Sequence, residues 1–154
     1  MGKWSAMILG IALAVPAFAD VASDARAHDE AFAKACEAGD LKGVVALYTD
    51  DAVVIWPGAG EEAKGKAQIE KLAADLCNPK TKPKAVIKSD EAMALGDSHI
   101  AITGHWELSQ TGADGKRTTS HIRVTEVIVK TPAGWRYVSD HASIGVPPPK
   151  TAKK

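Results

Sequence analysis

The sequence predicts an α+β fold in which helices pack on one face of a curved antiparallel sheet. The first observation is that apolar residues follow helical spacing before Pro83, whereas apolar and polar residues alternate from Lys84 onward, as in strands. The second is a hairpin pattern near the end of the chain, where two strand-like runs flank a Thr-Pro-Ala-Gly break at 131–134. A chain of 154 residues suits a single domain, which we expect at residues 20–145.

The N-terminus has the pattern of a secretion signal. Lys3 supplies a positive charge, residues 4–15 form an apolar run too short to span a bilayer, and Ala17-Phe18-Ala19 resembles a cleavage site. We therefore expect residues 1–19 to be a cleaved signal peptide and the protein to be periplasmic or secreted. The alternative is a cytosolic protein with a buried N-terminal helix. No later apolar run is long enough for a membrane helix, so we expect no membrane insertion.

Three helices are expected before Pro83. Residues 22–38 contain good helix formers with apolar residues at helical spacing, and Gly39 follows as a C-terminal cap. Asp40 can cap a short helix over 41–48. The third helix, over 66–77, has one apolar face.

Strands account for most of the remaining chain. A β-branched run that ends at Pro57 predicts the first strand. Gly104 lies within a later strand, which indicates a bulge or bend there. The polar, proline-rich segment 146–154 is expected to be a disordered tail. The expected strands cover 52–56, 85–89, 91–95, 98–108, 118–130 and 135–144.

The final hairpin carries two rows of polar and aromatic side chains, a composition typical of a ligand cavity. Successive side chains in a strand point to opposite faces, so alternate residues share a face. The rows are His121, Arg123, Thr125 and Val127 on one strand, and Trp135, Tyr137, Ser139, His141 and Ser143 on the next. The residues we expect to bind a ligand are Trp56, Trp106, His121, Arg123, Trp135 and His141.

His141 is the best candidate for a catalytic group, because histidine exchanges protons near neutral pH. A structural histidine within the sheet is the alternative interpretation. Arg123 is suited to anchoring an anionic ligand, or else forms an ion pair with Glu126 or Asp140. Glu126 is expected on the opposite face from Arg123, in solvent or at a dimer interface. The three tryptophans could equally be plain core.

Composition argues against several other classes of function. The formal net charge is zero, which gives no electrostatic basis for binding nucleic acid. The five histidines are scattered, and there is no phosphate loop or dinucleotide fingerprint, so we expect neither metal nor cofactor. Cys36 and Cys77 fit two interpretations, a disulfide formed after export or two separately buried thiols.

Four segments in order resemble the nuclear transport factor 2-like superfamily, also called SnoaL-like. The first two lie within AGDLKGVVALYTDDAVVIWPG at 38–58. The third is GKAQIEKL at 65–72, and the fourth is GWRYVSDHAS at 134–143. The resemblance implies a cone-shaped α+β fold with a pocket between sheet and helices, and often a homodimer. A dimer packed through the sheet is also expected because the strand at 118–130 is apolar on both sides.

The superfamily includes ketosteroid isomerase, polyketide cyclases, dehydratases and proteins that are not enzymes, so the fold leaves function open. The isomerase's catalytic aspartate precedes the proline that closes the first strand, where this chain has Trp56. The isomerase's tyrosine donor on the first helix corresponds to Phe32. Because neither side chain can exchange a proton, we do not expect isomerase-type catalysis.

The sequence therefore gives three hypotheses. The first is an exported SnoaL-like protein that binds a small, partly apolar molecule in its cone cavity, with no catalysis established. The second is an enzyme of the cyclase, dehydratase or isomerase type that uses His141 with Arg123 or His121. The third is a dimeric protein-interaction module whose sheet surface matters more than its cavity.

Overall fold

The computed structural model describes residues 18–57 and 62–145. Most of the expected signal peptide (1–19) and all of the expected tail (146–154) lie outside these residues, so both stay predictions. Within the described part of the chain, no helix is long and apolar enough to cross a membrane.

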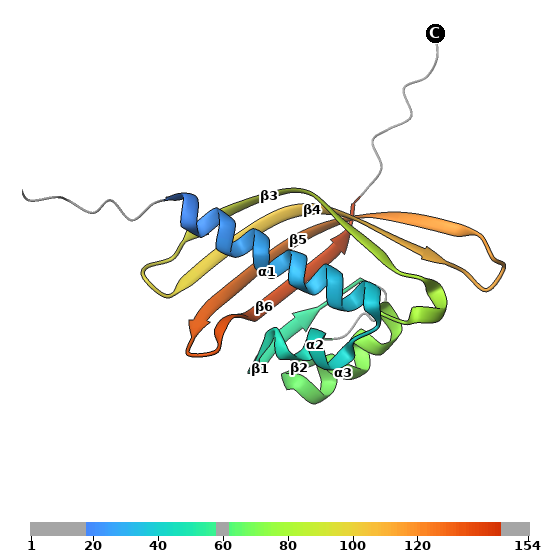
Figure 1. Cartoon of the computed structure of the whole chain (residues 1–154), viewed down its shortest axis with the longest axis horizontal. Coiled ribbons are helices and arrows are strands. Elements are labelled where there is room, and N and C mark those ends of the chain that lie inside the picture. The colour runs from blue at the N-terminus through green and yellow to red at the C-terminus, as the bar shows by residue number, and fades with distance from the viewer. Residues whose placement is uncertain (1–17, 58–61, 146–154) are drawn as a thin grey trace, which may run out of the picture.

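Helices and a curved sheet form two layers (Figure 1). Helix α1 (Phe18–Ala38) lies across one face of the sheet, and α2 (Leu41–Ala46) and α3 (Gly65–Leu76) gather near its C-terminal end. The three expected helices are thus confirmed, with the short one ending before Tyr48. A 3-10 turn follows at Pro79–Thr81. The strands are β1 (Tyr48–Ile55), β2 (Ala63–Lys64), β3 (Lys84–Ala94), β4 (His99–Thr111), β5 (Arg117–Thr131) and β6 (Gly134–Ile144).

The sheet is mixed, which corrects the expectation of a purely antiparallel one. Its strand order is β2-β1-β6-β5-β4-β3. Strands β3 to β6 form the expected antiparallel meander, but β1 pairs in parallel with β6. The first and last strands are therefore neighbours, and β1 brings Trp56 beside the strand that carries Asp140. A pairing between segments so distant along the chain leaves no local signal in the sequence.

A bulge at Lys88 bends β3, so the two short strands expected at 85–89 and 91–95 are one strand. The pairing with β4 shifts between Ile87 and Ser89. Gly104 pairs with Asp90, two residues beyond the bulge, and β4 pairs with β5 without a shift at this position, so the bulge expected at Gly104 lies in β3 instead. A Cβ atom at Gly104 would lie 2.7 Å from the backbone oxygen of Ser89. The glycine is therefore required by the close approach of β3.

Replacing Gly104 with alanine is expected to lower the free energy of unfolding by about 1–3 kcal/mol, because a backbone atom must move to admit the methyl group. Urea denaturation followed by circular dichroism measures the change. Thr103→Val, at an exposed neighbouring position on β4, is the control and should change stability by less than about 0.5 kcal/mol. Equal stability of the Gly104→Ala variant and the unmodified protein would show that β3 can move aside without lowering the free energy of unfolding.

A second irregularity sets which residues of β6 face the helices. Val127 pairs with Ser139 but Ile128 pairs with Tyr137, so Val138 is an extra residue in β6. The bulge shifts the alternation by one residue. Tyr137 and Asp140 are consequently both buried on the helix side, whereas Ser139 is exposed. The expected row from Trp135 to Ser143 is therefore split between the two faces.

Cys36 and Cys77 form a disulfide in the structure. The bridge joins the last turn of α1 to the end of α3, and both residues are buried in the core. Of the two interpretations that the sequence left open, the structure has the bridged one.

Candidate functional site

A cavity lies between α1 and the inner face of the sheet, the face that α1 covers. Its volume is about 60 Å³. One water needs about 10–15 Å³, so the cavity has room for roughly four to six water-sized groups. Its wall is mainly apolar, with four aromatic rings and two acidic side chains among the lining residues. These six are Phe32, Trp56, Trp106, Glu126, Tyr137 and Asp140.

The aromatic rings are arranged around Phe32 of α1. Ring centroids lie 5.6 Å from Phe32 for Trp56, 6.1 Å for Trp106 and 6.4 Å for Tyr137. The planes meet the Phe32 ring at 75°, 73° and 85°, so each contact is edge-to-face. Three of the rings come from α1, β4 and β6 and that of Trp56 from just beyond β1, so together they hold α1 against the sheet.

Asp140 is the most strongly hydrogen-bonded acid at the cavity. Its Oδ2 accepts hydrogen bonds from the Tyr48 hydroxyl at 2.7 Å and from Trp56 Nε1 at 2.8 Å. Its Oδ1 has no hydrogen-bond partner among the described residues. Burial raises the pKa of Asp140 above its usual value, and the two donated hydrogen bonds oppose that shift. Trp56, expected as an apolar wall, is therefore also a hydrogen-bond donor.

Glu126 lies directly opposite Asp140 in the pairing of β5 with β6. The side chain is 4% exposed, and its Oε2 has no partner within the described part of the chain. Burial raises the pKa of Glu126 well above its usual range, and the neighbouring Asp140 and Asp29 raise it further. Two carboxyl groups thus meet at an apolar cavity, where a proton stabilises the pair.

A third buried acid, Asp29, extends this group beneath α1. Its Oδ1 accepts a 2.6 Å hydrogen bond from the Tyr137 hydroxyl. Burial raises the pKa of Asp29 to about 7. The adjacent His28 is also buried, with its ring 4.3 Å from that of Tyr137, and burial lowers its pKa to about 4. His28 is therefore neutral at physiological pH.

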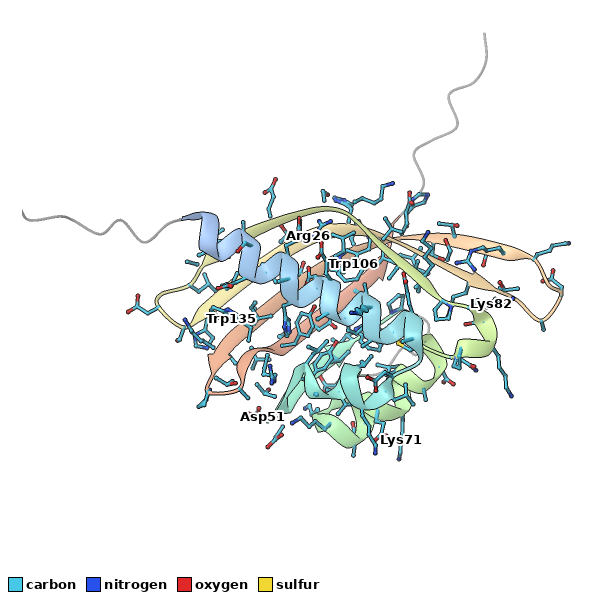
Figure 2. The ribbon with its side chains drawn as sticks, viewed as in Figure 1. Arg26, Asp51, Lys71, Lys82, Trp106 and Trp135 are labelled. Carbon is cyan, nitrogen blue, oxygen red and sulfur yellow. A yellow bond between two sulfur atoms is a disulfide. The ribbon has the colours of Figure 1, made fainter. Side chains whose placement is uncertain are left out.

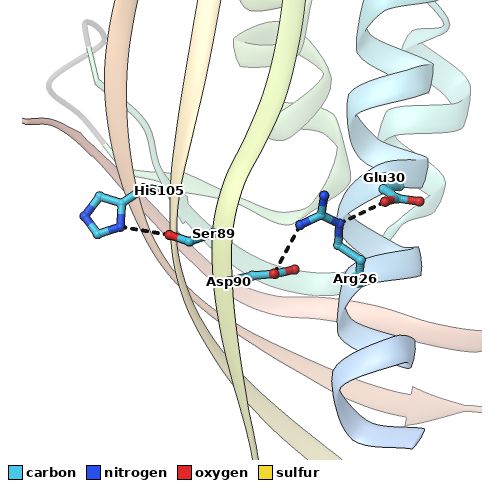
Figure 3. A network of polar contacts seen from close by, with 5 residues as sticks. All are labelled: Arg26, Glu30, Ser89, Asp90 and His105. Atoms are coloured by element: carbon cyan, nitrogen blue, oxygen red, sulfur yellow. Dashed lines mark hydrogen bonds and ion pairs between the residues drawn. The ribbon is translucent and has the colours of Figure 1, made fainter. Parts of the chain in front are cut away.

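Arg26 is the cation nearest to this acidic group on α1, and it is already paired. Its guanidinium donates to Glu30 at 2.8 Å and to Asp90 of β3 at 3.1 Å (Figure 3). On the same strand, Ser89 points to the other side and contacts His105 at 3.3 Å. Strand β3 thus separates an inner acidic region from an outer face that carries histidine.

The structure places three of the expected ligand-binding residues on the outer face of the sheet, away from the cavity. His121, Arg123 and His141 are all exposed. His121 Nδ1 lies 3.8 Å from a Glu107 oxygen, and Arg123 donates to the Ile144 carbonyl at 3.4 Å. The expectation that the three face the cavity was wrong. His121 and Arg123 line a groove on the outer face instead.

The remaining expected residues divide differently. Trp56 and Trp106 line the cavity. Trp135 is half-buried near the β5–β6 turn, well away from Trp106, with Lys130 Nζ 5.7 Å from its ring centroid (Figure 2). Glu126, expected in solvent or at an interface, is buried instead.

The alternation along β5 was predicted correctly, but its inner face was assigned to the wrong row. The row with Ile122, Val124 and Ile128 is the more apolar one and is buried. Choosing the more apolar row as the core face would have placed Glu126 inside. For Asp140 no such signal exists, because its direction depends on the bulge at Val138.

No three histidine, cysteine, aspartate or glutamate side chains in the described ranges are placed to hold a metal ion. The cavity can instead bind a small molecule against aromatic walls, with acidic oxygens for hydrogen bonds or charge. It can also exchange a proton through Glu126 and Asp140.

Fold and cavity together define a cone-shaped α+β protein of the nuclear transport factor 2-like class. The sequence matches the SnoaL-like domain family over residues 26–147, and the chain belongs to that family. A search of curated proteins found no match.

Solved structures share the fold. A nuclear transport factor 2-like superfamily protein from Salmonella enterica serovar Typhimurium is 19% identical, with a TM-score of 0.74 over 90% of this chain and 100% of that one. A ketosteroid isomerase-like protein from Erwinia carotovora atroseptica is 23% identical, with a TM-score of 0.67 over 81% and 96%. An NTF2-like protein with a cystatin-like fold from Novosphingobium aromaticivorans is 17% identical, with a TM-score of 0.70 over 85% and 86%. At these identities the likeness establishes the fold alone.

Proposed function

We propose that this SnoaL-like protein binds a small, partly apolar molecule in the cavity beneath α1. The observation that carries the proposal is an aromatic cavity bordered by two buried acids, each with an oxygen that has no partner among the described residues. A buried polar atom without a hydrogen bond is costly, so a ligand that supplies the missing contacts is favoured there. The aromatic walls supply the apolar part of the contact.

A second candidate is acid–base catalysis of the dehydratase, cyclase or isomerase type. The raised pKa values of Glu126 and Asp140 favour it, because a carboxyl group that titrates nearer neutral pH can give and take protons efficiently. If the protein is an enzyme of this type, Glu126 and Asp140 are the groups that exchange protons with the substrate. His141, Arg123 and His121 lie on the other face of the sheet and would not reach a molecule in the cavity.

The outer face of the sheet is the proposed site of homodimerisation. It exposes Met93 at 65% and Ile55 at 41% among polar side chains. A second copy would cover these apolar groups. The third hypothesis, an interaction module with a filled cavity, is less favoured because Trp56 and Trp106 border an open space. Export stays part of the proposal, and the Cys36–Cys77 bridge supports it because disulfides persist in oxidising compartments.

Native mass spectrometry of protein purified from its own host tests this proposal. We expect a homodimer that carries one small molecule per subunit, and Trp106→Ala should reduce the bound fraction by removing one wall. Trp135→Ala is the matched control, since Trp135 is not among the residues that line the cavity. Ligand-free protein, or equal occupancy in the two variants, would contradict binding in this cavity. Conversion of the recovered ligand to a product on incubation would identify an enzyme.

A further inference from the structure

The cavity has acidic side chains at its wall without a positive charge to match them. Among its described lining residues there is no lysine, arginine or histidine, whereas Glu126 and Asp140 are both acidic and nine-tenths or more buried. The nearest guanidinium on α1, that of Arg26, is already engaged by Glu30 and Asp90. Buried carboxylates are stable only with a proton or a cation nearby. The charge balance of the cavity therefore favours a positively charged occupant.

Aromatic faces provide the second element of cation binding. The negative face of an aromatic ring attracts a cation within about 6 Å, most strongly for tryptophan. Phe32, Trp56, Trp106 and Tyr137 line the same small space, with Phe32 nearly perpendicular to the other three rings. Rings that meet at steep angles form the sides of a box. An alkylated ammonium suits such a box because its charge is spread over methyl groups that also contact the rings.

Trp106 adds one hydrogen-bond donor. Its Nε1 is buried and has no acceptor among the described residues. A ligand oxygen would satisfy this donor. The cavity volume of about 60 Å³ has room for roughly four to six non-hydrogen atoms, which is the alkylated ammonium head of such a ligand, so the rest of the ligand lies at the cavity mouth.

We propose that the cavity selects a small alkylated ammonium ion bearing an oxygen, of the size of choline, held between the four rings and the Glu126–Asp140 pair. This inference rests on the proposed ligand-binding function of the same cavity and names the chemical class of its ligand. Tryptophan and carboxylate together recognise the charge, and the Trp106 indole N–H recognises the oxygen. A neutral molecule of the same shape would fill the space but leave the acids without a counter-charge.

The test uses the full chain and two probes of matched shape. Choline is compared with neohexyl alcohol, in which a quaternary carbon replaces the nitrogen. Isothermal titration calorimetry measures affinity, and tryptophan fluorescence reports contact with Trp56 and Trp106. We expect choline to bind about tenfold or more tightly than the alcohol. Glu126→Gln should weaken choline roughly ten- to hundredfold, whereas Glu107→Gln, on the neighbouring strand β4, should leave it unchanged.

Choline affinity should also rise between pH 5 and pH 8, because the cation binds the ionised acid pair and displaces its proton. The titratable groups that act on Glu126 are Asp140 from β6, Asp29 from α1 and Asp90 from β3. Burial raises the pKa of Tyr48 and Tyr137, and Glu126 adds to that shift. Burial is also the main cause of the rise in the pKa of Asp140, which the adjacent His141 opposes. Arg26 is the charged group that faces Asp90. Affinity that does not change with pH would count against the inference.

Two results would overturn it. Equal affinities for choline and neohexyl alcohol, unchanged by Glu126→Gln, would show an apolar cavity without charge selection, and the proposed ligand-binding function would stand. No binding of either probe at millimolar concentration would reject the choline-sized class. In that case the molecule detected by native mass spectrometry of host-purified protein would decide separately whether the cavity binds a ligand.

Discussion

Removing the disulfide, as Cys36→Ala/Cys77→Ala, is expected to lower the free energy of unfolding by about 4 kcal/mol. The two cysteines are 41 residues apart in sequence, and a bridge that closes a loop of this length restricts the unfolded chain by about that amount. The free energy of unfolding of domains of this size is only about 5–15 kcal/mol, so the variant should lose a large part of its stability. Denaturation in urea, with and without dithiothreitol, measures the loss.

The reductant provides an internal control. Unfolding in the presence of dithiothreitol should bring the unmodified protein close to the double variant, and should leave the variant itself unchanged. Equal stability of oxidised protein and double variant would mean that the bridge does not constrain the unfolded chain. Cys36 also lines the cavity, so the bridge fixes the end of α1 beside the ligand site. Reduced protein should therefore bind the cavity ligand more weakly.

The sequence predicted the positions of the helices and strands well, but it predicted poorly which side chains of each strand face the helices. Periodicity located the three helices and the final hairpin because both patterns are local. The parallel pairing of β1 with β6 depends on residues about 85 apart along the chain, for which no short-range rule exists. At Gly104 the structure shows a close approach of another backbone, one reason for a glycine within a strand, whereas the bulge expected there lies in β3.

At the candidate site, the sequence assigned several side chains to the wrong face of the sheet. His141 and Arg123 have versatile chemistry, which favours them as site residues in the sequence, but both face outward. The acids Glu126 and Asp140 are buried, although acidic side chains are seldom found in a core. The burial of Asp140 depends on the bulge at Val138 and on hydrogen bonds from Tyr48 of β1 and from Trp56, just beyond that strand. Sequence periodicity contains neither of these facts.

Glu126→Gln is expected to stabilise the protein above neutral pH and to reduce the pH dependence of its stability. Asp29 has its pKa raised from 3.8 to about 7, and that of Glu126 is raised well above 4.5. A raised carboxyl pKa means that the folded state binds its proton more tightly than the unfolded state. Such a group contributes stability below the unfolded pKa, and this stability is lost as pH rises through the folded pKa.

His28 acts in the opposite direction at lower pH. Its pKa is lowered from 6.5 to about 4, so the unfolded state takes up a proton that the buried ring resists. Its contribution is complete above pH 6.5 and is lost as pH falls towards 4. Between about pH 4 and 6.5 this gain with rising pH offsets the loss from Asp29, so the range above pH 6.5 reports the acids alone.

Urea denaturation at half-unit intervals between pH 5 and 8.5 tests this prediction. Above pH 6.5 the unmodified protein should lose about 1.4 kcal/mol per pH unit for each inner acid that still holds its proton in the folded state. Glu126→Gln keeps the size of the side chain but cannot ionise, so it should be more stable than the unmodified protein at pH 8 by about 1–3 kcal/mol. Some slope should remain, because Asp29 still titrates. Glu70→Gln, at an exposed position on α3, is the control and should match the unmodified protein across the range. A free energy of unfolding that rises from pH 6.5 to 8.5 would show that the inner acids ionise in the folded protein without loss of stability. The raised pKa values and the proposed need for a positively charged ligand would then both be wrong.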